Sequence, residues 1–123
     1  MANMASKGST DRFVRHGGHA PIDLAQLATN TLGNRELQQE VLKLFLARSK
    51  TLISELSDAD DRQHQADLVH SLKGSARGIG ALRLADVCDT VEEELREGSS
   101  PAFLTLVSLV GETNDFIREL IEG

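Results

Sequence analysis

The chain has 123 residues, 40% of them hydrophobic and 26% charged, as expected for one soluble globular domain with a modest core. Its 13 basic and 19 acidic residues give a formal net charge of −6, and its only aromatic residues are four phenylalanines, which together disfavour nucleic acid as a partner. The single cysteine excludes an internal disulfide. No apolar run approaches the ~18 residues of a membrane span and no secretory signal is present, so we expect a cytoplasmic protein that does not associate with a membrane.

Residues 1–20 are rich in glycine, serine and basic residues and have no apolar period, which predicts a flexible N-terminal tail. His16 and His19 lie in this stretch, but two histidines are too few for a metal site, and we expect the chain to hold no metal or cofactor of its own. Residues 21–123 are expected to form a single domain. Its two prolines, Pro21 and Pro101, leave a long proline-free stretch between them, which favours helices.

Five helices are predicted in chain order, over residues 23–31, 35–57, 60–80, 82–97 and 101–122. Typical capping residues bound them: Asn34 before the second, Gly98 after the fourth, and Ser100 with Pro101 at the start of the fifth. No segment alternates apolar and polar residues with a period of two. The sequence therefore predicts an all-α protein, an up-down-up-down four-helix bundle with an additional short N-terminal helix at one end or side.

Apolar residues at steps of three and four mark the faces expected to point inward. In the second helix these are Leu37, Val41, Leu44, Phe45, Leu52 and Leu56, in the fourth Leu84, Val87, Cys88, Val91 and Leu95, and in the fifth Phe103, Leu106, Val107, Val110, Ile117 and Leu120.

His70 lies on the polar side of the third predicted helix. At about 100° per residue and with His70 at zero, Leu68, Leu72 and Ile79 fall at about 160°, 200° and 180°. The histidine is therefore expected to point toward solvent or a partner rather than into the core. An ordinary surface histidine is the alternative interpretation that this geometry leaves open.

Three neighbours of His70 favour a functional role over that alternative. Lys73 and Gly74 lie one helical turn further on, and Arg77 lies two turns on, on the same face. A glycine inside a helix costs about 1 kcal/mol relative to alanine, and the missing side chain of Gly74 leaves room for another protein to approach the ring. Lys73 and Arg77 supply positive charge beside an imidazole that a bulky anionic group can reach.

This arrangement suits phosphoryl chemistry better than metal binding or hydrolysis. A neutral, exposed imidazole is a nucleophile near neutral pH, and nearby cations stabilise phosphoryl oxygens after transfer. Cations repel a metal ion, the sequence has no second histidine four residues on, and no serine or cysteine nucleophile is evidently paired with the ring.

The segment also resembles the phosphorylation motif of histidine-containing phosphotransfer (HPt) domains, on the residues His70, Lys73, Gly74, Ser75, Ala76, Ile79, Gly80 and Ala81. HPt domains are four-helix bundles that carry a phosphoryl group between receiver domains in multistep phosphorelays. The resemblance, which spans about residues 21–122, implies that His70 is the phosphoacceptor, that Lys73 lies near the phosphoryl group and that Gly74 opens access to the ring.

One position departs from that resemblance. Several HPt domains offer a glutamine to the imidazole 22 residues after the phosphoacceptor, where this chain has Glu92. A carboxylate that accepts from Nδ1–H would orient the ring and leave Nε2 free to attack, and Arg96, one turn further on, could offset its charge. The alternative is that Glu92, Glu93 and Glu94 form a solvated acidic face.

We therefore expect a phosphocarrier that takes a phosphoryl group from the aspartyl phosphate of one receiver domain and passes it to another. The expected partners are response-regulator receiver domains and a hybrid or separate histidine kinase. Mg²⁺ would come from the receiver. The sequence has no glycine-rich ATP loop, so no ATP-dependent kinase activity of its own is expected. The alternatives are a helical adaptor without phosphoryl chemistry and a histidine-kinase dimerisation domain. The latter builds its bundle from two chains, whereas this chain is expected to be a monomer.

The partner is expected to dock over the exposed face around His70. Gln63, Asp67 and Arg77 fall within about 60° of His70 on the helical wheel. Leu42, Leu46 or Ile53 would add an apolar patch if the short first helix leaves them uncovered.

Overall fold

The computed structural model describes residues 20–122, and the tail predicted for residues 1–20 lies outside them except for Ala20. All regular structure in this range is helical, in the order α2 (Leu24–Asn30), α3 (Arg35–Asp58), α4 (Arg62–Gly78), α5 (Leu82–Glu97) and α6 (Phe103–Glu122). The predicted all-α class and the five helices are confirmed. Within residues 20–122, none of the helices has the length and apolar character needed to cross a membrane.

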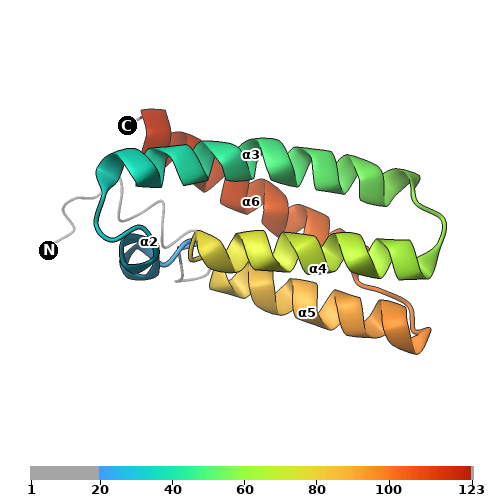
Figure 1. Ribbon diagram of the computed structural model, residues 1–123. Helices are drawn as coiled ribbons and strands as arrows, with labels where there is room; N and C mark the ends of the chain where they lie inside the picture. Colours follow the sequence, from blue (N-terminus) through green and yellow to red (C-terminus); the bar gives the residue numbers. More distant parts are fainter. Residues whose placement is uncertain (1–19, 123) are drawn as a thin grey trace, which may run out of the picture.

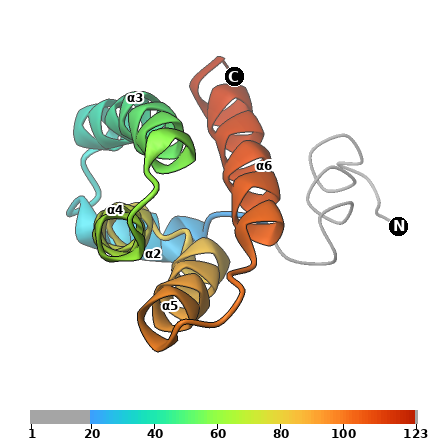
Figure 2. The same ribbon diagram turned by 90° about the vertical axis from the view of Figure 1, so that its right-hand side faces the viewer.

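The four long helices alternate in direction and form the corners of a bundle (Figures 1 and 2). α3 packs against α4 and α6, and α5 packs against α4 and α6, with the closest packing between α4 and α5. Short connections of three to five residues join the long helices, so consecutive helices lie antiparallel. The up-down-up-down topology expected from the sequence is therefore the one observed.

Side-chain caps fix where three of the helices begin. A side-chain oxygen of Asp23, Asn34 or Asp61 accepts a hydrogen bond from the backbone N–H three residues on, at 3.1, 2.9 and 3.3 Å respectively. At the C-terminal end of α5, Gly98 adopts a left-handed conformation with φ 81°, which glycine accommodates without strain.

The start of α6 differs from the prediction. The helix begins at Phe103 rather than at Pro101, and the Ala102 carbonyl accepts its first backbone hydrogen bond, from Leu106 N–H. Glu94 explains the shift, because its side chain accepts a hydrogen bond from Ala102 N–H at 2.9 Å and holds the preceding residues against α5. Ser100 and Pro101 therefore lie in the connection.

α2 lies across the end of the bundle where α4 ends (Figure 1). Asp23 N–H donates to the Gly80 carbonyl at 2.8 Å, and the Asn30 side-chain amide donates to the carbonyls of Arg77 and Gly78. Gly80 has φ 81°, and a Cβ there would lie 2.7 Å from the Asp23 carbonyl oxygen. A glycine is thus needed for α2 to approach this turn so closely.

The core contains most of the predicted inward residues, with Ala66, Leu68, Val69, Leu72, Ala76 and Ile79 from α4. Leu44 and Val107 were wrongly predicted to point inward, since they are 67% and 44% exposed. Leu37 was also predicted to point inward and is exposed. Leu42, Leu109 and Phe116 are buried in addition to the predicted set. Each error concerns neighbouring positions on a wide apolar arc of one helix. The directions of the packed helices decide which of these positions are buried.

Candidate functional site

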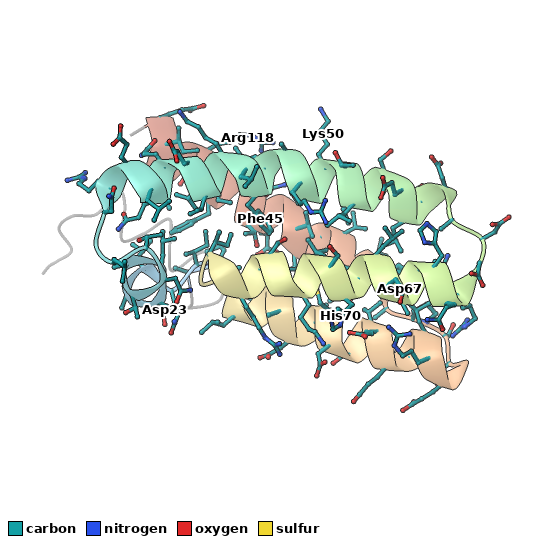
Figure 3. The ribbon with its side chains drawn as sticks, in the orientation of Figure 1. Asp23, Phe45, Lys50, Asp67, His70 and Arg118 are labelled. Carbon is teal, nitrogen blue, oxygen red and sulfur yellow. The ribbon has the colours of Figure 1, made fainter. Side chains whose placement is uncertain are left out.

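His70 lies in the middle of α4 and projects from the outer face of the bundle (Figure 3). Its side chain is 63% exposed, whereas Leu68 and Leu72 are buried on the opposite side of the helix. The imidazole is thus held on a packed helix and remains open to a partner. The core of α4 fixes the position of its backbone.

Glu92 of α5 faces the ring, and both its carboxylate oxygens lie 3.2 Å from His70 Nδ1. A carboxylate ionised near neutral pH only accepts hydrogen bonds, so this contact requires the proton on Nδ1 and, in the neutral ring, leaves the lone pair on Nε2. The Glu92 side chain is only 12% exposed. Glu94 has a different partner, Ala102 N–H. Glu92, Glu93 and Glu94 therefore do not form one solvated face.

Lys73 of α4 is buried and contacts two carboxylates of α5. Its Nζ lies 2.9 Å from Asp89 Oδ1 and 3.0 Å from Glu92 Oε1. The hydrogen bond to Asp89, and then the one to Glu92, raises the pKa of Lys73, so the ammonium form is favoured. The predicted cation is present, and its charge is directed toward α5.

Arg96 holds the other side of the Glu92 carboxylate. Its guanidinium donates to Glu92 Oε2 at 3.0 and 3.2 Å and to Asp67 Oδ1 of α4 at 3.3 Å. Burial alone would raise the pKa of Glu92. The hydrogen bonds from Lys73, His70 and Arg96 outweigh burial and lower that pKa to about 2. Glu92 is therefore ionised throughout the physiological range.

Gly74 is exposed one turn along α4 from His70. A Cβ built at this position would meet no atom within 4 Å, so packing within the described domain does not require a glycine here. Gly74 follows His70 by four residues and therefore lies on the same face of α4. Arg77 is also exposed on this face, but no contact among residues 20–122 brings its guanidinium into the network around Glu92.

The sequence reasoning missed Asp89 as a member of the network. Asp89, Glu92 and Arg96 follow each other at steps of three and four and therefore share one face of α5. That spacing was a usable signal, but the pairing with Lys73 depends on the register between α4 and α5. Within the described range, no group of three or more metal-ligating side chains is suitably placed for a metal ion.

An apolar groove between α3 and α4 was also missed. It has a volume of about 280 Å³ and is lined by Val41, Leu44, Phe45, Arg48, Ser75, Gly78 and Ile79. At the edge of the groove, the Arg48 guanidinium donates to Ser71 Oγ at 2.8 Å, and Ser71 directly follows His70 in the sequence. The exposed Leu44 gives this groove its accessible apolar wall.

The apolar patch expected from Leu42, Leu46 and Ile53 is not present as predicted. Leu42 is buried in the core, and the other two are only half-buried against it. Gln63 and Asp67 are exposed on α4 as expected, and their side chains contact each other at 3.4 Å. The exposed apolar surface beside α4 is therefore the groove at Leu44.

Comparison with known proteins identifies a family for this sequence. The sequence profile of the Hpt domain matches residues 40–123. The signal transduction histidine-protein kinases BarA of Shigella flexneri, Escherichia coli strain K12 and Escherichia coli O157:H7 are each 26% identical over 106 residues, which cover 82% of this chain but 12% of the relative. The chain thus spans a small part of these curated relatives, and no solved structure matches it significantly. Since the Hpt profile covers more than half of the chain, including α4 and α5, the chain belongs to the Hpt domain family.

Proposed function

We propose that His70 accepts a phosphoryl group from the aspartyl phosphate of one receiver domain and passes it to the aspartate of another. This refines the phosphotransfer role in two-component systems that membership of the Hpt family supports. The observation that carries the proposal is the His70 ring itself, which is exposed at 63% while its Nδ1 is held by Glu92 at 3.2 Å. This leaves Nε2 as the outward nucleophile.

The proposed transfer is an in-line displacement. The Nε2 lone pair of His70 attacks phosphorus, the bond from phosphorus to the aspartyl oxygen breaks, and the aspartate leaves as a carboxylate. Positioning and charge stabilisation carry most of such reactions. The receiver would supply Mg²⁺ and its acidic pocket, and this chain would supply an oriented imidazole.

Lys73 and Arg96 act in this proposal mainly by holding the carboxylate that orients the ring. Lys73 is 9% exposed and already contacts two carboxylates, so it stabilises the phosphoryl group at a distance through its charge. Gly74 admits the receiver, and Arg77 adds exposed positive charge on the same face. Because Hpt domains are phosphocarrier modules, we further propose that the chain lacks ATP-dependent kinase activity.

The groove between α3 and α4 is the proposed docking surface for the receiver. Its residues from α4 and the C-cap of that helix, Ser75, Gly78 and Ile79, lie five to nine residues after His70, and Leu44 of α3 is exposed in its wall. An exposed apolar patch beside a reactive group is typical of a transient interface. The proposed working form is a cytoplasmic monomer, which is compatible with a bundle closed by four long helices of one chain and with a reduced, buried Cys88.

A direct test uses a receiver domain carrying a labelled aspartyl phosphate, incubated with the protein and Mg²⁺. We expect acid-labile, base-stable label on the wild type and on His64→Gln, which changes another exposed histidine of α4, but none on His70→Gln. Label that persists on His70→Gln would contradict the assignment. A His70→Ala variant that still supports all partner output would favour the helical adaptor instead.

A further inference from the structure

The carboxylate beside His70 Nδ1 is fixed from two further directions. Glu92 Oε1 accepts from Lys73 Nζ at 3.0 Å, and Glu92 Oε2 accepts from Arg96 at 3.0 Å, while each oxygen lies 3.2 Å from the ring nitrogen. Turning this carboxylate away from the ring would break its contacts with both cations. Glu92 is therefore held against the ring by contacts within this domain alone.

The charges around this carboxylate do not cancel. Lys73 and Arg96 contribute two positive charges, whereas Glu92 and their other partners, Asp89 and Asp67, contribute three negative charges. These five side chains thus carry one net negative charge, and two further acidic residues, Glu93 and Glu97, line the same pocket as Glu92. Arg77 is exposed on the same face of α4 as His70 but makes no contact with these groups among residues 20–122, and Arg48 of α3 is bound to Ser71.

The state of Nδ1 matters because it decides what leaves when the phosphoryl group departs. If Nδ1 carries a proton, breaking the bond between phosphorus and Nε2 releases a neutral imidazole. If that proton is lost, the same step releases an imidazolate anion, which is a far poorer leaving group. Retention of the Nδ1 proton is therefore a condition for rapid donation.

We infer that Glu92 keeps Nδ1 of phosphorylated His70 protonated and thereby sets the upper pH limit of phosphoryl donation. The inference rests on the proposed function and deepens it. A carboxylate pairs with the positive ring of the phosphorylated, Nδ1-protonated form, which a neutral glutamine at the same position would stabilise less. Glutamate and glutamine at this position can both orient the ring, but only the charged glutamate extends the pH range of phosphoryl donation.

The proposal also balances protons. Neutral His70, with its proton on Nδ1, attacks through Nε2 and becomes a positively charged phosphoimidazolium without losing that proton. On donation, the electron pair of the breaking bond returns to Nε2 and the neutral ring is restored, while a carboxylate oxygen of the receiver forms the new bond to phosphorus. Glu92 neither gains nor loses a proton in either direction.

The experiment compares wild type with Glu92→Gln after chemical phosphorylation with phosphoramidate, so that no receiver is needed. The ³¹P signal of phosphorylated His70 is followed from about pH 5 to about pH 10, and the rate of phosphoryl loss is measured across the same range. We expect the midpoint of the ³¹P titration to lie about one pH unit lower in Glu92→Gln than in wild type. The shift is no larger because the two cations paired with Glu92 weaken the effect of its charge. Above both midpoints, phosphoryl loss from Glu92→Gln should be about tenfold slower than from wild type, and below both midpoints the two rates should be equal.

Asp89→Asn is the matched control, since it removes the same charge and a Lys73 contact but no contact with the ring. Its midpoint should move by less than half as much. Equal midpoints in wild type and Glu92→Gln, or an equal shift in Asp89→Asn, would overturn the inference and leave Glu92 as an orienting residue only. Absence of His70 label from both phosphoramidate and receivers would instead overturn the proposed function, and the inference with it.

Discussion

Lys73 and His70 meet at one atom, because Oε1 of Glu92 lies 3.0 Å from the Lys73 ammonium nitrogen and 3.2 Å from His70 Nδ1. A buried cation and an exposed ring are thereby connected through a single carboxylate oxygen. The position of that carboxylate depends on a residue that the solvent hardly reaches. Stability of the domain and orientation of the ring are consequently linked.

Lys73→Met should weaken both properties. It leaves Glu92 and Asp89 without their shared cation, and we expect the free energy of unfolding to fall by about 2 kcal/mol, less than for a fully buried pair. Transfer to His70 should slow by about tenfold as the carboxylate becomes mobile. Denaturant unfolding and receiver assays measure the two effects. Lys50→Met, at an exposed position of α3 that points away from the bundle (Figure 3), should change neither.

Glu92 should make the domain sensitive to acid. Its pKa in the folded protein, about 2, lies below the ordinary value of 4.5, so its stabilising effect is complete above about pH 4.5 and is lost as the pH falls through about 2. The shift corresponds to about 3 kcal/mol, which we reduce to about 2 kcal/mol because the network is partly open to solvent. Unfolding of wild type and Glu92→Gln should differ most at neutral pH and converge toward pH 2. A difference that stays constant with pH would contradict this.

Gly74→Gln should separate stability from function. A Cβ at this position meets no atom within 4 Å, and glutamine is a better helix former than glycine, so stability should rise by about 0.5–1 kcal/mol. The longer side chain should obstruct the receiver and slow transfer by about tenfold or more. Gly111→Gln on α6, where a Cβ also meets nothing, is the control that should gain stability without losing transfer. Undiminished transfer in Gly74→Gln would remove its role in access.

Leu44→Glu tests the groove as the receiver surface. Leu44 is exposed, so the substitution should change stability by no more than about 0.5 kcal/mol. A charge in an apolar contact should instead weaken receiver binding by about tenfold, measured as a higher receiver concentration for half-maximal transfer. Leu104→Glu changes another exposed leucine, which lines a separate pocket between α5 and α6, and should leave transfer unchanged. If both variants transfer like wild type, the receiver docks elsewhere.

Much of this architecture was predictable because each long helix carries its own apolar stripe and its own boundary signals. The direction of His70 followed from α4 alone, since its apolar stripe lies on the opposite side of the same helix. The start of α6 could not be predicted from its own sequence. The side chain of Glu94 binds Ala102 N–H in a segment that helix propensity alone would place in the helix. Leu44 and Val107 were misassigned for a related reason: a single helix does not show which edge of a wide apolar arc its neighbours cover.

The site divides in the same way. Glu92 was expected from the resemblance to HPt domains, and Arg96 from its spacing to Glu92. Asp89 and the contact between Arg96 and Asp67 required the register between α4 and α5, which no pattern within either helix contains. The groove at Leu44 likewise arises only when α3 and α4 lie side by side.

The attachment of α2 to the end of α4 bears on where the domain can be cut. The match to the Hpt profile begins at residue 40, within α3. A fragment starting there would lack Asn30, whose amide donates to the carbonyls of Arg77 and Gly78. It would also leave the sharp turn at Gly80 without the backbone partner supplied by Asp23. We expect the end of the histidine-bearing helix to fray in such a fragment, and we expect a stably folded fragment to include α2.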